Sequence, residues 1–388
     1  MRKIFFFLLL LFSFKSYSQQ DSATHLQISV ITCAPGNDLY SIFGHTAIRI
    51  IDSTNHTDLF YNYGTFDFSD PDFYSKFVRG KLNYFLNIDN ANDFFASYLQ
   101  EGRTIYEQIL HLTNQQKQTI QQYLINNLSG NNKYYKYDFL FDNCTTRARD
   151  VLTKNTGFTS NWQLVAQGTT FRNMLYQYLD SAGACWSKLG IDILLGSKID
   201  VPVTMEKSTF LPDYFMHSVD SFNTKNIFVT DRKKYEASIP ATEKDNHQPL
   251  IIFSFLAVIV VALVNIKHKV IQTIFRYYAM FIVFVTGLLG CLLLFMWFGT
   301  DHKSCAANYN LLWALPTNII ACFLVNKKTN YAKNYFLIGL VISGLTVVFW
   351  FLLPQQFNVA LFPFVFSNMF CYKALWQNIK TKMQVQQL

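Results

Sequence analysis

Charged residues, and acidic residues above all, are scarce in this chain of 388 residues. They make up 15% of the sequence, whereas 51% of the residues are hydrophobic. The scarcity is uneven, because residues 248–388 contain one acidic residue and residues 19–247 contain 24. This composition excludes an ordinary soluble protein, and the polar first part excludes a chain that lies in a membrane throughout. We therefore expect an exported domain over residues 19–247 and a membrane domain over residues 248–388.

Cysteine patterns typical of metal sites are also missing. None of the seven cysteines has the spacing of a zinc site, so we expect neither a metal nor a cofactor. In the exported domain an oxidising compartment permits a Cys33–Cys185 disulfide, although the sequence cannot establish one. Cys305 falls in a short loop between apolar segments. Three further cysteines fall inside apolar segments, where we expect them to act as small hydrophobic residues: Cys291, Cys322 and Cys371.

The first 18 residues have the composition of a signal peptide. Arg2 and Lys3 precede a short run of Ile, Phe and Leu, and Ser16 and Ser18 follow it. A basic start, a short apolar core and small residues two apart predict export and cleavage after Ser18. An uncleaved anchor is the alternative, although the apolar run is short for a membrane span.

Five apolar segments after residue 248 predict five membrane helices. Lys and Arg residues occur after the first and third segments and at the end of the fifth, whereas the alternate loops carry only Lys303. Basic loops remain on the cytoplasmic side, so this distribution places the C-terminus inside and residues 19–247 outside. The segments are residues 249–266, 277–298, 311–325, 335–353 and 357–375.

The net charge of +8 follows the same division. Residues 19–247 contain 20 Lys and Arg against 24 Asp and Glu, residues 248–388 contain ten against one, and residues 1–18 add three basic residues. The contributions are therefore −4, +9 and +3. Because the basic excess lies beside the apolar segments, it reflects topology and gives no reason to expect a nucleic acid partner.

The exported domain begins with a pattern of short strands. Residues 27–32, 45–51 and 59–63 are rich in β-branched and aromatic residues and are separated by turn residues. They predict antiparallel strands, with a hairpin between the second and the third. Helices are expected over residues 113–128, over residues 142–154 with Asp142 as N-cap, and over residues 171–180, and a polar linker over residues 231–248.

Cys144 is the candidate nucleophile. It follows the expected N-cap of a helix, where the partial positive charge and the unpaired amides stabilise a thiolate and lower its pKa. The same amides could hold an oxyanion, and Arg147 and Arg149 add positive potential. A buried structural role remains open for Cys144 alone, since free cysteine is among the most buried residue types.

His45 is the candidate base. It opens a strand after Gly44, which allows another group to approach closely. If residues 52–55 form the hairpin turn, Asn62 lies across from His45 and could hold the imidazole tautomer, although a slip of one residue would remove it from that face. His56 and Asp142 are the other candidates for this third role.

A histidine strand followed much later by a cysteine at a helix start resembles the circularly permuted papain-like fold, an α+β fold that includes NlpC-type and lecithin:retinol acyltransferase-like enzymes. Six motifs resemble, more narrowly, the Lnb family, the lipoprotein N-acyltransferases of Bacteroidetes-type bacteria. The resemblance covers nearly the whole mature chain, including a membrane domain of five spans. The motifs are TCAPG (32–36), FGHTA (43–47), YGTFDF (63–68), DNCTTR (142–147), GIDILLG (190–196) and FLP (210–212).

The resemblance implies that His45 and Cys144 form a catalytic pair, with Asn62 as our choice of third member. It implies a multi-pass protein of the bacterial inner membrane whose periplasmic domain moves a fatty acyl chain. The partners would be the membrane, a phospholipid or other lipid acyl donor, and diacylated lipoproteins as acceptors. Asn143, Arg147 and His302 are candidate substrate-binding residues.

The outer loop around His302 is polar, which suits a lipid headgroup or a lipoprotein, although loops are normally polar. The rival function is a membrane-tethered cysteine peptidase or cell-wall amidase of NlpC type, which would use the same pair. A third possibility is a membrane scaffold without catalysis. A single anchor would suffice for a peptidase, whereas five spans favour the handling of lipid.

Overall fold

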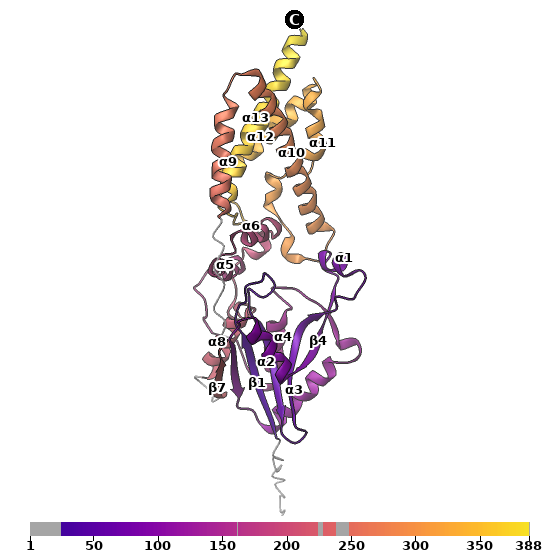
Figure 1. Ribbon diagram of the computed structural model, residues 1–388, viewed down its shortest axis with the longest axis vertical. Helices are drawn as coiled ribbons and strands as arrows, with labels where there is room; N and C mark the ends of the chain where they lie inside the picture. The colour runs from indigo at the N-terminus through magenta and orange to yellow at the C-terminus, as the bar shows by residue number, and fades with distance from the viewer. Residues whose placement is uncertain (1–24, 161, 224–227, 238–247, 388) are drawn as a thin grey trace, which may run out of the picture.

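The computed structural model describes residues 25–160, 162–223, 228–237 and 248–387. The molecule is elongated, with a sheet-containing domain at one end and a bundle of helices at the other (Figure 1). The expected signal peptide, its cleavage after Ser18 and residues 238–247 of the expected linker lie outside the described residues.

A seven-stranded antiparallel sheet forms the centre of the first domain. Its strand order is β6-β4-β3-β2-β1-β5-β7. The first three strands lie where the sequence predicts them, and Asp52 makes the expected hairpin turn by accepting the backbone N–H groups of Thr54 and Asn55 at 2.9 and 3.2 Å. The strands are β1 (Leu26–Cys33), β2 (His45–Asp52), β3 (Thr57–Phe66), β4 (Asn83–Asn90), β5 (Ile105–Leu110), β6 (Tyr134–Lys136) and β7 (Val229–Tyr235).

The prediction of a linker from residue 231 was wrong for its first residues. Strand β7 pairs antiparallel with β5 and forms one edge of the sheet. Its charged residues are exposed along the strand, as is typical of an edge that must not pair with another chain. Such a strand lacks the alternation of apolar and polar residues by which strands are recognised in a sequence.

Helices cover both faces of the sheet. On one face, apolar residues of α4 such as Val151 and Leu152 share a core with Ile28, Val30 and Ile48 of the strands. On the opposite face, Phe94 of α2 belongs to a smaller core formed with residues of β1, β2 and β3. The helices of this domain are α1 (Phe73–Val78), α2 (Ala91–Gln100), α3 (Asn114–Asn127), η1 (Gly130–Asn132), α4 (Cys144–Thr156) and α8 (Pro212–Asn223).

A group of short helices lies between the sheet and the bundle (Figure 1). A buried ion pair holds it together: Arg172, which is 0% exposed, contacts Asp192 at 2.6 Å and Asp200 at 2.7 Å. Asp192 also accepts the side-chain amide of Asn358 from the bundle at 2.8 Å, so the two parts of the molecule are joined here. The helices are α5 (Phe171–Ser181), α6 (Cys185–Leu194), η2 (Ser197–Ile199) and α7 (Met205–Ser208).

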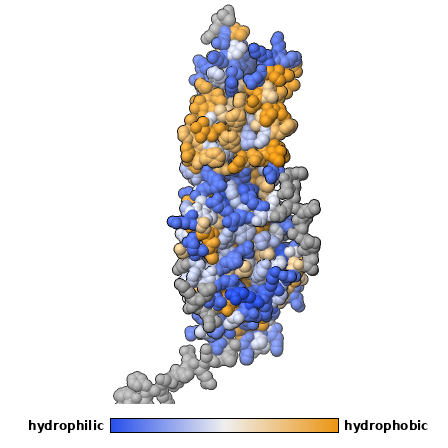
Figure 2. Space-filling view, turned by 90° about the vertical axis from the view of Figure 1, so that its left-hand side faces the viewer, coloured by the Kyte–Doolittle hydropathy of each residue, from blue (hydrophilic) through white to orange (hydrophobic). Residues whose placement is uncertain are grey.

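Two of the described helices, α10 and α12, are long and apolar enough to cross a membrane, and α9 is apolar but has 16 residues. Large apolar side chains are exposed along α9, α10 and α12. Figure 2 shows them as a hydrophobic belt bounded on both sides by hydrophilic surface, the arrangement of a protein that lipid surrounds. The elements are α9 (Pro249–Val264), α10 (Lys269–Phe298), η3 (Lys303–Cys305), η4 (Tyr309–Leu312), α11 (Asn318–Ala321), η5 (Cys322–Asn326), α12 (Asn330–Val348) and α13 (Leu361–Gln387).

The third predicted span is not one continuous helix. Residues 311–325 contain Pro316 and fold as η4, α11 and η5. The broken chain lies tightly against α10, where a Cβ on Gly287 would come within 2.3 Å of the backbone nitrogen of Ile319. Asn318 is completely buried, and its side-chain amide donates to the hydroxyls of Thr286 and Tyr372 at 3.0 and 2.7 Å, so neighbouring helices satisfy this polar side chain inside the bundle.

Candidate active site

His45 and Cys144 meet at one end of the sheet. His45 is the first residue of β2, and Cys144 is the first residue of α4. Thr46 and Thr145, the residues that follow the pair, hold β2 against α4. Their hydroxyls are both buried and lie 3.0 Å apart. The thiol and the imidazole therefore belong to two elements that are tied together one residue away from the pair.

The helix that carries Cys144 begins one residue later than expected. Its N-cap is Asn143, not Asp142: the Asn143 side chain accepts the N–H of Thr146 at 2.8 Å, and the Thr146 hydroxyl accepts the N–H of Asn143 at 2.8 Å. The Asn143 amide also donates to the carbonyl groups of Phe139 and Phe210, at 2.8 and 2.9 Å. Cys144 is consequently the N1 residue, where the helix dipole acts most strongly on a thiolate.

The environment of Cys144 favours its thiolate. The residue is buried, with 9% of its surface exposed, and burial by itself raises the pKa of the thiol. The charge and hydrogen bond of His45, together with the Thr46 N–H and the Thr145 hydroxyl, outweigh burial and lower the pKa from 9.0 to about 7. In the reverse direction, burial lowers the pKa of His45, but the neighbouring Cys144 and Asn62 raise it overall. The pair is therefore set up as thiolate and imidazolium.

This ion pair predicts the pH dependence of Cys144 alkylation. Because the thiolate is the reactive form, the rate of reaction with iodoacetamide should rise with pH through about 7, the pKa of the thiol. In His45→Ala the lowering influence of the imidazolium is lost, so the midpoint should move upward. Mass spectrometry of the peptide that contains Cys144 measures both rates, and an unchanged midpoint in His45→Ala would show that the histidine does not act on the thiol.

Asn62 lies on the same face as His45, although in a different register from the one expected. The register of β2 and β3 pairs Ile48 with Tyr61, and when continued it places Gly64 opposite His45. Asn62 is thus two residues away along β3, and two residues preserve the face of a strand. His45 Nε2 lies 3.1 Å from Asn62 Oδ1.

A carboxylate extends this chain of contacts and fixes the tautomer. The Asn62 amide group donates to Asp89 Oδ2 at 2.7 Å, and Asn87 donates to Asp89 Oδ1 at 2.9 Å. Since the Asn62 nitrogen is used by Asp89, its oxygen faces the imidazole and must accept the Nε2–H. The lone pair of the neutral ring therefore lies on Nδ1.

Sequence reasoning missed three residues around the pair. Asp89 belongs to β4, a strand that was not anticipated, where the alternation of Asn87 and Asp89 on one face was the available signal. The Tyr98 ring stacks on His45 with centroids 6.0 Å apart. Cys33 lies directly across from His45 in the sheet, and burial raises the pKa of its thiol, so it remains protonated. Cys33 and Cys185 are both free, and the permitted disulfide is not formed.

Gly64 lies next to Cys144. Gly64 has a φ of +94°, and a Cβ at this position would lie 3.7 Å from the Cys144 Cβ and 3.4 Å from the Tyr137 ring. A larger residue would be strained at this φ and would lie against Cys144. Gly64 of the YGTFDF motif therefore brings the backbone of β3 close to Cys144 with no side chain between them.

The other candidates for the third role lie elsewhere. His56 has a φ of 53° and is exposed in the β2–β3 turn, at the end of the hairpin away from His45. Asp142 pairs instead with Arg147, whose guanidinium contacts both carboxylate oxygens at 2.6 and 2.8 Å. Asn62 is the candidate that the structure brings to the imidazole.

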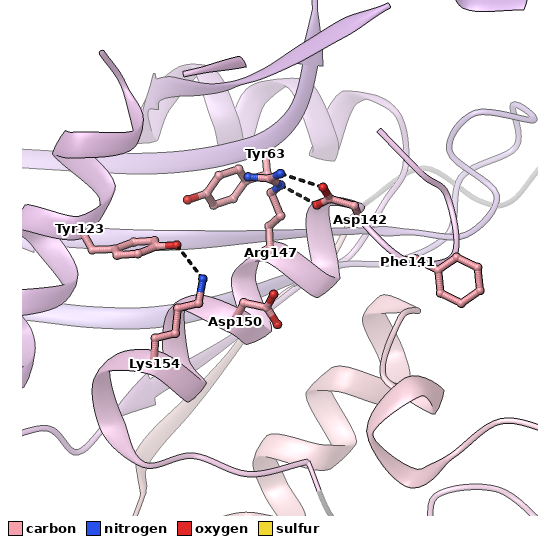
Figure 3. Close-up of a pocket in the computed structure, with 7 residues that line it drawn as sticks. All are labelled: Tyr63, Tyr123, Phe141, Asp142, Arg147, Asp150 and Lys154. Atoms are coloured by element: carbon pink, nitrogen blue, oxygen red, sulfur yellow. Dashed lines mark hydrogen bonds and ion pairs between the residues drawn. The ribbon is translucent and has the colours of Figure 1, made fainter. Parts of the chain in front are cut away.

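Arg147 lines a pocket of about 280 Å³ that is formed by residues of β3, α3, α4 and the turn before α4 (Figure 3). Its guanidinium lies 3.5 Å from the Tyr135 ring centroid, so the pairing with Asp142 and this aromatic contact together fix its orientation. Neither His45 nor Cys144 lines the pocket, which places Arg147 next to the pair but in a separate hollow. The lining residues are Tyr63, Tyr123, Phe141, Asp142, Arg147, Asp150 and Lys154.

His302 contributes to the contact between the sheet-containing domain and the helical bundle. Its Nε2 lies 3.2 Å from the carbonyl oxygen of Phe77, and the N–H of Asp301 donates to the carbonyl of Arg79 at 2.9 Å. In the same outer loop Asn308 and Asn310 are buried and donate to carbonyl groups of α6. His302, a candidate for headgroup binding, thus joins the outer loop to α1, and Asn308 and Asn310 join the same loop to α6.

The end of the sheet that carries His45 faces the bundle. Helix α1, which touches the outer loop, lies between the last residue of β3 and the first residue of β4. Because β2 is antiparallel to β3, the start of β2 with His45 lies at this same end of the sheet. The fold and site therefore define a membrane-anchored protein with a thiol–imidazole pair close to the membrane domain.

Two family models match this chain, in the order in which its domains occur. The Lnb N-terminal periplasmic domain matches residues 13–178, and the Lnb transmembrane domain matches residues 241–382. Together they cover most of the sequence, and the chain belongs to the Lnb family, as the motifs predicted. It is an Lnb-type membrane protein of lipoprotein biogenesis with a periplasmic part. No curated protein and no solved structure matches it.

Proposed function

We propose that this protein is a cysteine-dependent lipoprotein N-acyltransferase. The observation that carries the proposal is the Cys144–His45 pair, whose thiol pKa is lowered to about 7 at the end of the sheet that faces the membrane domain. A thiolate at this end of the sheet can attack the ester groups of membrane lipids. The thioester that results is a suitable intermediate for acyl transfer.

The first half-reaction acylates the enzyme. With the proton of Cys144 already on Nδ1 of His45, the thiolate Sγ attacks the carbonyl carbon of a phospholipid ester. The C–S bond forms as the C–O bond breaks, and the imidazolium returns the proton to the departing alkoxide, which leaves as a lysolipid. The Thr46 N–H and the first amides of α4 are the nearest donors for the developing oxyanion.

The second half-reaction transfers the acyl group to nitrogen. The α-amine of a diacylglyceryl-cysteine lipoprotein attacks the thioester, a C–N bond forms, and the C–S bond breaks. The amine proton passes to His45, which regenerates the thiolate–imidazolium pair. Donor and acceptor are both anchored in the membrane, so they reach Cys144 at one depth, which supplies proximity. No cofactor takes part in these steps.

The proposed topology has five crossings of the inner membrane with residues 19–247 in the periplasm. Its support is the basic composition of the loops at residues 267–276 and 326–334. A cysteine introduced at Lys328 should be labelled only by reagents that reach the cytoplasm. Labelling from the periplasmic side would overturn this topology.

Purified protein in lipid should transfer an acyl group to a diacylglyceryl-cysteine peptide, with an acyl–Cys144 adduct in the absence of the peptide. The rival function, an NlpC-type peptidase or amidase, requires water to finish each cycle, whereas a transferase must exclude it. Cleavage of cell-wall peptides by the full-length protein without any acyl adduct would establish the rival.

Asn62 should act as a positioning residue. Asn62→Ala removes the acceptor of the Nε2–H, so the neutral ring loses its fixed tautomer, and transfer should fall by about tenfold to a hundredfold. The midpoint of Cys144 alkylation against pH should also move, which a purely structural role would not cause. Asn62→Gln retains both the acceptor oxygen and the amide that donates to Asp89, and should restore part of the rate. A variant Asn62→Ala with normal transfer would remove Asn62 from the mechanism.

A further inference from the structure

Aromatic side chains are exposed on the segment that joins β3 to β4. In residues 66–80, here termed the aromatic segment, Phe68, Tyr74 and Phe77 are 73%, 80% and 49% exposed. Soluble surfaces rarely gather so much apolar surface without a partner. The aromatic segment includes the end of β3 and all of α1.

The aromatic segment is held at the level where the membrane domain ends. Its Phe77 and Arg79 carbonyl groups contact His302 and Asp301 at 3.2 and 2.9 Å, and Figure 1 shows α1 beside the end of α10. Helix α10 ends at Phe298, whose ring is stacked on Trp297 and is 74% exposed. Trp and other aromatic residues at the ends of membrane helices mark the interface between lipid and water. The aromatic segment therefore lies at this interface.

Its charges suit the same place. Arg79 and Lys81 are exposed directly after α1, Asp67 and Asp72 are exposed before it, and Lys76 pairs with Asp70 at 2.8 Å. Exposed aromatic side chains with Lys and Arg beside them are typical of segments that lie in the plane of a membrane surface, because the rings enter the acyl region and the cations remain among the headgroups.

A row of aromatic rings leads from the aromatic segment to the nucleophile. The centroids of Phe68 and Phe66 are 4.7 Å apart, those of Phe66 and Tyr84 are 5.2 Å apart, and those of Tyr84 and Tyr137 are 4.6 Å apart. Tyr137 lies beside Gly64, which is next to Cys144. Phe68 is 73% exposed and Tyr84 is 9% exposed, so the row leads from the exposed aromatic segment into the core that contains Cys144.

We propose that the aromatic segment inserts into the outer leaflet and that the row of rings is the surface along which a phospholipid acyl chain reaches Cys144. The ligand that binds to the row of rings is a phospholipid of that leaflet, since the membrane domain places the aromatic segment against the leaflet. The insertion stands on its own, whereas the passage of the chain to Cys144 rests on the proposed acyl transfer.

Photo-crosslinking of the full-length protein tests the insertion. With p-benzoylphenylalanine in place of Tyr74, in nanodiscs of phosphatidylethanolamine and phosphatidylglycerol, illumination should attach phospholipid to the protein, as detected by intact mass. The matched control has the same residue in place of Thr54, an exposed position in the β2–β3 turn at the opposite end of the sheet. Absence of lipid adducts at position 74, or equal yields at both positions, would overturn the insertion.

Cys144 acylation tests the passage of the chain. In Phe68→Ser, which alters an exposed side chain, the mole fraction of phospholipid for half-maximal acylation should rise several-fold, while reaction with a short water-soluble ester stays unchanged. An unchanged phospholipid requirement would overturn the passage. If lipid adducts form at position 74 but Cys144 is never acylated, the result supports the insertion and contradicts the proposed acyl transfer.

Discussion

Cys144→Ser should insert and fold normally but lose nearly all acyl transfer. Serine preserves the size of the side chain at the start of α4, but its hydroxyl does not ionise near neutral pH as a thiol does. His45→Ala should have a similar effect, because it removes the base and raises the pKa of the thiol. Transfer to a diacylglyceryl-cysteine peptide measures the loss.

Cys33→Ser is the matched control for this result. Cys33 is buried across from His45, and burial raises the pKa of its thiol. The Cys33→Ser substitution should therefore affect the stability of the protein more than the rate of acyl transfer. Substantial transfer by Cys144→Ser, or equal loss of transfer in a folded Cys33→Ser, would contradict the assignment of Cys144 as the nucleophile.

The second large effect concerns stability. Arg172→Met should lower the free energy of unfolding by about 3–5 kcal/mol, because it leaves the buried carboxylates of Asp192 and Asp200 without their cation. Asp192 is also bound by Tyr176 and by Asn358 of the membrane domain, so the loss should loosen the contact between the domains. Unfolding of the full-length protein in detergent measures the change.

Arg232→Met provides the control. Its pair with Asp220 has a similar length of 2.6 Å, but both side chains are substantially exposed, at 51% and 35%. Exposed pairs contribute about 0–1 kcal/mol, so this variant should unfold almost as the parent does. Similar small changes in both variants would show that the Arg172 network does not stabilise the junction between the domains.

Local patterns predicted much of the sheet. Strands β1 to β3 and the Asp52 turn follow from side-chain alternation and turn chemistry, which act over a few neighbouring residues. Asn62 was placed two residues from its observed register, yet on the correct face, because strand faces repeat every two residues. The N-cap was misplaced by one residue because Asp142 and Asn143 are both good caps. Asp142 pairs instead with Arg147, whereas Asn143 caps the helix and donates to the distant carbonyl of Phe210.

The remaining features depend on contacts between distant parts of the chain. Asp89 contacts Asn62 only because β4 lies beside β3. Residues 229–235 form the strand β7 only because they pair with β5. Asp192 and Gly196 in the GIDILLG motif form the contact with the membrane domain, where a Cβ on Gly196 would come within 2.1 Å of the Ala306 carbonyl oxygen. No local pattern predicts such partners.

Intact-mass and peptide analysis of the full-length protein in phospholipid, without an acceptor, tests the central proposal most directly. We expect one acyl group per protein in thioester linkage on Cys144, which disappears when a diacylglyceryl-cysteine peptide is added and reappears as an amide on that peptide. An acyl group on another residue, or a protein that stays unmodified while it cleaves peptides, would contradict the proposal.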